Sequence, residues 1–423
     1  MYSGAAGRPA RGSDPRTTAS TGTGAHTARG FGWFAVGVGS WFGAWGMQQV
    51  LFSWIVVGEL AAPSEWVGIA QTSTMLPSSF LLLAGGAVAD RLDPRRVLAA
   101  LHVAAAAAAG SLALASALGA VSFGVLLAYG LVIGTVQAFS MPARDTLLSH
   151  VAGRDMLRAV TTMTATSSSC QASGSLLAGL ARLTGSAPML GVQALVFLLG
   201  AFVQHRVPDA PAADTVVPPR RAGRLGLGEI LEGARLVAAN ERLWAPALLV
   251  VSVGVFFIGP YLVVFPLLVR DVYGRGVGSL SVVLMLFPLG TIVGSLVLRA
   301  RGLGRKGAGA LAALCVGAAV EAVVGIGVPF GGLVAGTFVW GLGGAVFINA
   351  SRTLFQEAAP AAHRGRVLAV YQLGFMGGAP IGTFLAGFAV AVLGLHGTLL
   401  AASAAMALLV AVMATRTGLA RMR

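Results

Sequence analysis

The sequence predicts an all-α polytopic membrane protein, with twelve transmembrane helices in two pseudo-symmetric six-helix bundles. Of the 423 residues, 56% are hydrophobic and only 10% are charged, whereas a soluble domain carries about 25% charged residues. Twelve apolar stretches reach about 20 residues, the length that an α-helix needs to cross a bilayer. Related motifs also recur in the two halves of the chain. Together these observations predict a duplicated helical membrane protein.

The apolar stretches define the predicted spans. We expect helices because alternating strand patterns of about ten residues are absent and because lipid requires backbone groups to be satisfied within the element. The predicted spans are 31–58, 66–89, 97–118, 121–141, 158–182, 187–205, 243–269, 278–298, 308–328, 331–351, 366–393 and 397–415.

The basic residues set the predicted orientation. Of the 29 Lys and Arg residues, only Arg182, Arg270 and Arg275 fall on one side of the predicted membrane. Cytoplasmic loops collect Lys and Arg, so we expect both termini in the cytoplasm of a multi-pass cell-membrane protein. Membrane orientation also explains the net charge of +14, and no nucleic-acid partner is expected.

Composition divides the chain into five parts. The first thirty residues are polar and rich in Pro, Gly, Ser and Thr, which predicts disorder. The stretch GEILEGARLVAANERL is amphipathic, which predicts a short helix at the inner interface. The predicted parts are a disordered cytoplasmic tail at 1–30, an N-terminal six-helix bundle at 31–205, a cytoplasmic linker with the amphipathic helix at 206–242, a C-terminal six-helix bundle at 243–415 and a cytoplasmic tail at 416–423.

Internal repeats support the two-bundle division. GSLLAGL at 174–180 matches GTFLAGF at 382–388, and PARDTL at 142–147 matches ASRTLF at 350–355 with the same offset. Pro77 and Pro288 are separated by nearly that offset. Many transporters are built from such repeats, with the substrate site at the repeat interface.

The charged stretch GGAVADRLDPRR at 85–96 carries a family resemblance. Together with twelve spans and a 6+6 duplication, it resembles the major facilitator superfamily over residues 31–415. Asp93 and Pro94 depart from the family's loop pattern G-x-x-x-D-R-x-G-R-R, which has Gly and a basic residue there. PARDTLLSHVAGRDMLRAVTT and EGARLVAANERLW are similar to the enterobactin-exporter-like branch, which implies efflux of drugs or siderophores.

The resemblance implies an inner latch in the charged stretch. Asp90 would lie near the positive N-terminal end of the eleventh span, around Arg366, where a carboxylate gains about 0.3–1 kcal/mol. Arg95 and Arg96 are also explained as topology anchors, and Arg144 is a candidate ion partner of Asp90. The predicted latch residues are Gly86, Asp90, Arg91, Arg95, Arg96 and Arg144.

Glu321 is the acidic residue predicted in the middle of a span; the other fourteen of the 15 acids lie in tails, loops or span ends. An ionisable group at membrane depth is costly and suggests a function, so Glu321 is the proton-coupling candidate. The alternatives are that it faces an intramembrane partner or lies nearer the outer interface.

The resemblance also implies a central substrate cavity between the halves. Aromatic and amide side chains in an apolar pocket suit a bulky, amphipathic, weakly charged compound, although hydrogen bonding between helices explains a single Gln or Asn equally well. The cavity candidates are Trp45, Gln48, Gln49, Gln137, Gln171, Tyr261, Trp340, Asn349 and Gln372.

The sequence thus favours a secondary transporter that exports a small amphipathic organic molecule by proton antiport, with an importer or a non-transporting membrane sensor or scaffold as alternatives. No phosphate-binding loop or catalytic arrangement is recognisable, so we expect neither an enzyme nor a cofactor. Cys170 and Cys315 lack partners at metal-ligand spacing, and no metal is expected. The expected partners are the substrate, protons and the lipid bilayer, with the protein acting as a monomer.

Overall fold

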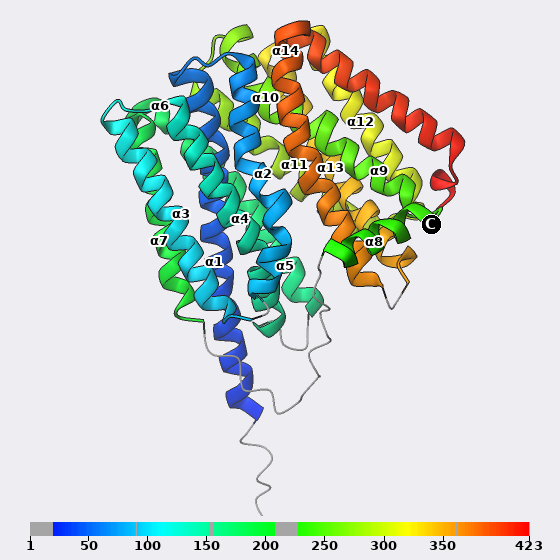
Figure 1. Cartoon of the computed structure of the whole chain (residues 1–423), viewed down its shortest axis with the longest axis horizontal. Helices are drawn as coiled ribbons and strands as arrows, with labels where there is room; N and C mark the ends of the chain where they lie inside the picture. Colours follow the sequence, from blue (N-terminus) through cyan, green and yellow to red (C-terminus); the bar gives the residue numbers. More distant parts are fainter. Residues whose placement is uncertain (1–19, 90, 152–155, 208–226, 361–362, 423) are drawn as a thin grey trace, which may run out of the picture.

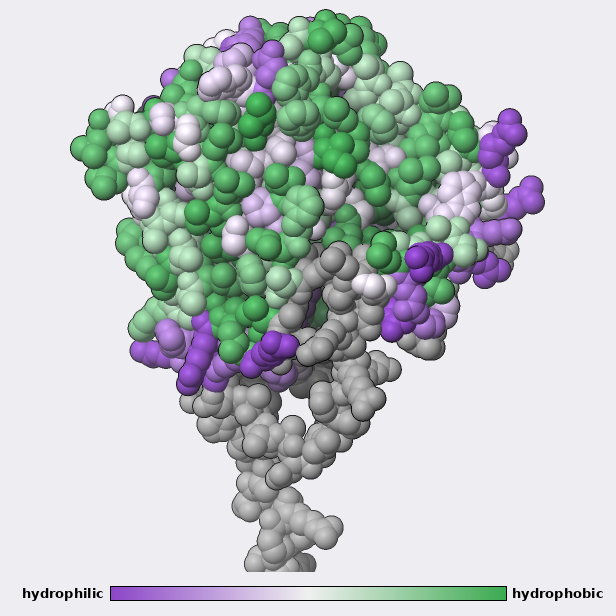
Figure 2. Space-filling model, viewed as in Figure 1, coloured by the Kyte–Doolittle hydropathy of each residue, from purple (hydrophilic) through white to green (hydrophobic). Residues whose placement is uncertain are grey.

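The computed structural model describes residues 20–89, 91–151, 156–207, 227–360 and 363–422, and within them every regular element is a helix. Eight helical stretches of this described part are long and apolar enough to cross a membrane. On the face shown in Figure 2, hydrophobic residues cover the middle of the molecule and hydrophilic residues gather near its lower rim. The all-α membrane architecture predicted from the sequence is confirmed.

The helices of the first half pack together as the N-terminal bundle (Figure 1). In it α1 packs on α5 and α7, α2 packs on α4, and α3 packs on α4 and α7. Its elements are α1 (Ser20–Trp54), η1 (Ile55–Glu59), α2 (Ser64–Ala89), α3 (Pro94–Ala117), α4 (Phe123–Val151), α5 (Met156–Ala178), α6 (Ala181–Thr184) and α7 (Ser186–Gln204).

The start of α1 corrects one predicted boundary. The helix begins at Ser20, inside the stretch 1–30 that was expected to be disordered. Extending an existing helix gains one hydrogen bond for each residue fixed, whereas starting a helix is costly. The apolar part of α1 can therefore propagate into polar sequence that would not begin a helix by itself; residues 1–19 lie outside the described residues.

The helices of the second half form the C-terminal bundle. At Gly394 (φ 72°, ψ 175°) the backbone leaves the helical conformation, so that α14 consists of two helices, one for each of the last two predicted spans; a positive φ is tolerated by glycine because it has no Cβ. The elements are α9 (Trp244–Val253), η2 (Gly254–Ile258), α10 (Gly259–Leu267), η3 (Leu268–Val272), α11 (Val277–Arg301), α12 (Lys306–Ile326), α13 (Phe330–Ala358), α14 (Arg364–Arg416) and η4 (Leu419–Arg421).

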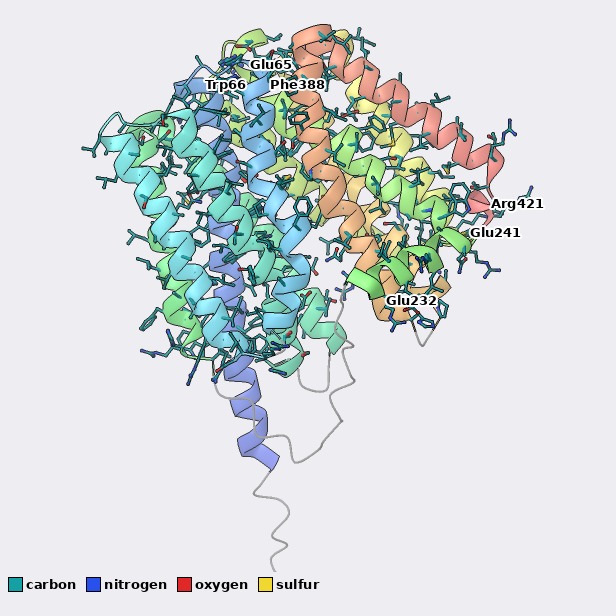
Figure 3. All side chains as sticks on the ribbon, in the orientation of Figure 1. Glu65, Trp66, Glu232, Glu241, Phe388 and Arg421 are labelled. Atoms are coloured by element: carbon teal, nitrogen blue, oxygen red, sulfur yellow. The ribbon has the colours of Figure 1, made fainter. Side chains whose placement is uncertain are left out.

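The amphipathic stretch of the linker forms α8 (Leu227–Ala239), which packs on α14. We call the end of the molecule at which α3 begins and which carries Glu232 the linker end (Figures 1 and 3). The opposite end, which carries Glu65 and Phe388, is the far end (Figure 3).

The two bundles meet along α2 with α14 and along α5 with α11. Thr72 Oγ1 and Thr383 Oγ1 lie 2.9 Å apart, and Ser79 Oγ donates to the Met376 carbonyl at 2.6 Å. Nearer the far end, a Cβ added to Gly68 would lie 2.8 Å from Gly387 Cα. These contacts place the backbones of α2 and α14 against each other from the far end to about the middle of α2.

Candidate functional site

A cavity of about 340 Å³ lies between the two bundles, with residues of both in its wall. This volume falls in the range of small-molecule sites. Among the described residues, no Asp, Glu, Lys, Arg or His lines it. From the N-terminal bundle the cavity is lined by Trp45, Gln49, Thr74, Met75, Ser78, Gln137 and Gln171, and from the C-terminal bundle by Val253, Phe257, Ile258, Tyr261, Leu262, Phe287, Pro288, Ala313, Leu314, Trp340, Gly343, Gly344, Phe347, Ile348, Phe375, Met376 and Ala379.

Trp340 is the centre of the aromatic side of the cavity. The ring centroid of Phe257 lies 5.2 Å from that of Trp340 at an interplanar angle of 90°, and the Tyr261 centroid lies at 5.9 Å and 88°. Phe287 contacts the same indole at 6.0 Å and 89°. Edge-to-face contacts of this kind stabilise aromatic pairs beyond the area they bury, so the four rings hold one another in place.

Amide groups occupy the opposite side. Gln171 Nε2 donates to Gln49 Oε1 at 3.1 Å, which joins α5 to α1. Gln137 Oε1 is buried and accepts no hydrogen bond within the described part of the chain. The N-terminal bundle therefore presents the amides of the cavity and one ring, Trp45, whereas the C-terminal bundle presents the other rings.

Six of the nine predicted cavity residues line this cavity: Trp45, Gln49, Gln137, Gln171, Tyr261 and Trp340. Gln48 instead lies in the core of the N-terminal bundle, where its Oε1 accepts from Tyr129 and, at 3.0 Å, from Gln193 Nε2. Adjacent residues on a helix point about 100° apart, and this separates Gln48 from Gln49.

Asn349 and Gln372 also lie outside the lining. Asn349 is exposed and donates to the Ala345 carbonyl at 2.8 Å on its own helix. Gln372 Nε2 lies 3.8 Å from Met141 Sδ, across the two bundles. The cavity residues that sequence reasoning missed include Phe287 and Ser78, each one residue from the repeat-related prolines Pro288 and Pro77. The repeat-related positions of Pro77 and Pro288 are the feature of the sequence that could have indicated Ser78 and Phe287 as cavity residues.

Glu321 lies on α12, close behind the aromatic side of the cavity. Its side chain is fully buried, and neither carboxyl oxygen has a hydrogen-bond partner among the described residues. Leu314 lies two turns earlier on the same face of α12 and lines the cavity. A separation of seven helical residues is about 10 Å, so Glu321 is near the cavity wall without belonging to it.

Gly317 links these two positions. It lies one turn before Glu321, and a Cβ added there would be 2.8 Å from Trp340 Nε1 and 2.7 Å from Phe257 Cε2. The aromatic side of the cavity therefore rests directly on the face of α12 that carries Glu321.

The charged stretch after α2 is partly described. Asp90 lies outside the described residues, and so do the surroundings of Gly86. Arg91 is exposed. The latch contacts predicted for these residues are therefore not part of the described structure.

Asp93 begins α3. Its carboxylate accepts from the Arg95 backbone N–H at 3.0 Å and from Arg95 Nη2 at 2.8 Å. The side-chain hydrogen bond from Arg95 is the main cause that holds the pKa of Asp93 below its usual value. An Asp N-cap followed by Pro94 at the first helical position is a favoured helix start. This accounts for the two departures from the family's loop pattern.

Arg95 and Arg96 face residues of their own bundle. Arg95 Nη1 donates to the Val207 carbonyl at 3.0 Å, which ties the start of α3 to the end of α7. Arg96 is largely exposed, with Nε 3.8 Å from Asp93. These contacts stabilise the linker end of the N-terminal bundle.

Arg144 packs on aromatic rings of α1. Its Cζ lies 4.8 Å from the Phe42 centroid and 5.3 Å from the Trp41 centroid. Nη2 is buried and donates no hydrogen bond to a described residue. The guanidinium is thus held by cation–π contacts.

Arg366, near which Asp90 was expected, contacts the linker helix. Its Nη1 donates to Glu232 Oε1 at 2.7 Å, and His363 Nδ1 lies 3.0 Å from the same nitrogen. A Cβ added to Gly233 would lie 2.9 Å from the Arg366 carbonyl oxygen. Helix α8 is therefore seated closely on the start of α14.

Comparison with known proteins gives a family and a fold. The profile of a family described as transmembrane secretion effector matches residues 27–422. No curated protein sequence matches the chain.

Three solved structures illustrate the similarity of fold. The nucleoside transporter NupG aligns with a TM-score of 0.72 and 16% identity, covering 92% of this chain and 98% of that one. A bacterial homologue of the human lysosomal transporter Spinster, in an inward-facing and unoccupied conformation, aligns with a TM-score of 0.69 and 12% identity, covering 96% and 97%. A POT family transporter in complex with 5-aminolevulinic acid aligns with a TM-score of 0.70 and 12% identity, covering 92% and 96%.

Proposed function

Because this chain belongs to the transmembrane secretion effector family of the major facilitator superfamily, and is therefore a multi-pass membrane transporter rather than an enzyme, we propose that it exports a small amphipathic organic molecule by proton antiport. The two bundles would alternate in opening the central cavity to either side of the cell membrane. The protein would act as a monomer, in the drug and siderophore efflux branch that its charged motifs resemble.

The uncharged cavity between the bundles is the observation that carries this proposal. Its wall is shared by the two bundles, so a rocking motion of one bundle against the other would change access to it. Rings and amides in the wall suit a compound with an apolar body and a few polar groups.

The distribution of contacts suggests the direction of access. The contacts of Gly68 and Thr72 with α14 lie in the far-end half, and that of Ser79 lies near the middle of α2. With both termini in the cytoplasm, as the basic residues favour, the far end faces outward. The structure would then correspond to the state that is closed to the outside and receives substrate from the cytoplasm.

The inner latch would close the opposite side. In that state Asp90 and Arg91 would approach the start of α14, and Gly86 would permit close helix contact. Arg95 and Arg96 would keep the loop in place through Asp93. Arg144, whose Nη2 donates no hydrogen bond to a described residue, would pair with Asp90.

Glu321 would carry the proton. Burying a charged carboxylate without a partner costs several kcal/mol, so the side chain holds a proton as long as it stays in this environment. A change in the packing of Phe257 and Trp340 on α12 during substrate binding would alter that environment. This contact couples occupancy of the cavity to release of the proton.

The proposal is tested by accumulation of amphipathic antibiotics and siderophores in a bacterial host depleted of its own pumps. Cells with the wild-type protein are expected to accumulate less of at least one compound, and a protonophore should abolish the difference. Glu321→Gln should abolish it as well, because the amide cannot bind and release a proton.

The matched control is Glu241→Gln, which removes an exposed carboxyl near the start of α9 and should export like the wild type. Raised accumulation with the wild-type protein would instead establish import. Export that persists with the protonophore would exclude proton antiport.

A further inference from the structure

The two sides of the cavity differ in chemistry, and this difference constrains the cargo. The C-terminal bundle contributes every Phe and Tyr of the lining, whereas all three glutamines come from the N-terminal bundle. A molecule in the cavity therefore meets most of the rings on one side, and the amides together with a single ring, Trp45, on the other.

The aromatic side offers ring surface and few polar groups. The hydroxyl of Tyr261 is already used, since it donates to the Leu284 carbonyl at 3.1 Å. Trp340 Nε1 points towards Gly317 on α12, and the indole is only 4% exposed. This side consequently selects for flat apolar surface through ring contacts.

The amide side keeps donors and acceptors available next to each other. In the Gln171–Gln49 hydrogen bond, one amide uses one N–H and the other its oxygen, so Gln49 Nε2 and Gln171 Oε1 keep no partner among the described residues. If the nitrogen and oxygen of both amides are exchanged, Gln49 donates to Gln171, and a nitrogen donor and an oxygen acceptor are again available side by side. Gln137 Oε1 adds a buried acceptor that has no partner among the described residues.

The cavity also lacks a countercharge. No acidic or basic side chain of a described residue lines it, and a charge moved from water into such surroundings is costly unless it is paired. Glu321 lies behind the wall and does not reach the lining.

From these features we infer that the cargo is an uncharged, planar aromatic molecule with a hydrogen-bond donor and acceptor side by side on one edge, as in a lactam. It binds with its ring face against the half-buried rings of Tyr261 and Phe287, which pack on Trp340, and its polar edge towards Gln49, Gln171 and Gln137. This inference rests on the proposed function, because it assumes that the cavity holds the cargo, and it adds the class and orientation of that cargo.

Three compounds with one ring system test it. Phenanthridin-6(5H)-one is neutral and has adjacent N–H and C=O groups, 5-methylphenanthridin-6-one lacks the donor, and 5-methylphenanthridinium carries a fixed positive charge. Their Kd values are measured by calorimetry on the purified full-length protein in lipid nanodiscs. We expect the lactam to bind about tenfold more tightly than its N-methyl analogue, the effect of about one hydrogen bond in a buried site, and the cation to bind most weakly.

Glutamine variants locate the polar edge. Gln171→Leu and Gln137→Leu should reduce the preference for the lactam to less than about twofold, with little change in the Kd of the N-methyl analogue. Gln356→Leu, at an exposed position of α13, is the matched control and should keep the full preference.

Aromatic variants locate the ring. Trp340→Leu should weaken both neutral compounds by the same factor and leave their ratio unchanged. Phe287→Leu, at a half-buried position of the wall, should likewise raise the Kd of both neutral compounds by the same factor. It replaces the tryptophan variant in this test if that variant does not fold.

Several outcomes would overturn the inference: equal binding of the two neutral compounds, a preference that survives the glutamine variants, tightest binding of the cation, or binding of none of the three. Efflux assays on the same compounds separate this result from the proposed function. If the protein prefers the lactam but exports none of the compounds, the inference about binding stands and the proposed export is contradicted. If it exports the compounds but does not prefer the lactam, export stands and the inference is contradicted.

Discussion

At the scale of single residues, Asp93 shows how a side chain at the linker end serves the fold. Asp93→Ala removes both the cap of α3 and the contact with Arg95, so the free energy of unfolding should fall by about 1 kcal/mol. Asp93→Asn keeps a capping oxygen and should lower the free energy of unfolding by only a few tenths of a kcal/mol, because Asn caps as well as Asp. Thermal unfolding of the purified variants measures both changes. Equal losses of unfolding free energy in the two variants would show that the charge of Asp93, and not its capping oxygen, stabilises the start of α3.

The same residue gives a pH dependence. The pKa of Asp93 in the folded protein lies below its usual value of 3.8 because Arg95 stabilises the carboxylate. A group with a lowered folded pKa contributes stability above its unfolded pKa and loses it as the pH falls through the folded pKa. The difference in stability between wild type and Asp93→Ala should therefore be constant near neutral pH and shrink below about pH 4.

The types of residue that line the cavity were predictable from the sequence, but not which of these side chains point into it. Gln49, Gln137 and Gln171 were recognised because an amide within an apolar span requires an explanation. Gln48 met the same criterion, yet it bonds to Tyr129 and Gln193 inside its own bundle. Which of two adjacent amides faces the cavity depends on the rotation of α1, and the sequence of α1 is apolar on nearly every side.

At the scale of elements, the contact of α2 with α14 depends on glycine. A Cβ at Gly68 would lie 2.7 Å from the Thr383 carbonyl oxygen and 2.8 Å from Gly387 Cα, and both of these are backbone atoms. Gly68→Ala should therefore push the helices apart at the far end. The expected result is a longer distance between spin labels at positions 66 and 388, in a background with Cys170→Ser and Cys315→Ser.

Gly110→Ala is the control for this change. A Cβ at Gly110 of α3 would have no neighbour within 4 Å, so the substitution should leave the label distance unchanged and stabilise the helix by up to about 1 kcal/mol. An unchanged distance in Gly68→Ala would show that the contact between α2 and α14 does not hold the far end closed.

Most elements followed from hydropathy, and the exceptions have local causes. All twelve predicted spans fall on helices of the described structure. α4 and α13 extend beyond their predicted ends, to Val151 and Ala358, because polar residues there continue the helix outside the apolar stretch. The close seating of α8 on α14 through Gly233 was not predictable, since it depends on two segments that are far apart in the chain.

At the scale of the whole molecule, duplication explains the two bundles but not how they meet. The repeated motifs predicted equivalent halves, and the cavity between them is nevertheless asymmetric, with all its glutamines from one half and all its rings except Trp45 from the other. After duplication each half is free to change its own lining, so symmetry predicts where the site lies and not what lines it. The sequence of α12 also gave no indication that Glu321 would lie behind Trp340.

The central claim is that protonation of Glu321 is coupled to export from the cavity. The most direct measurement uses everted membrane vesicles with an acidic interior, to which the best-exported compound of the accumulation panel is added. Wild type and the Glu241→Gln control should release protons on addition of the compound, seen as recovery of the fluorescence of a pH-gradient dye. Glu321→Gln should give no recovery while still binding the compound. Full recovery with Glu321→Gln, or none with the wild-type protein while it transports the compound, would contradict the account.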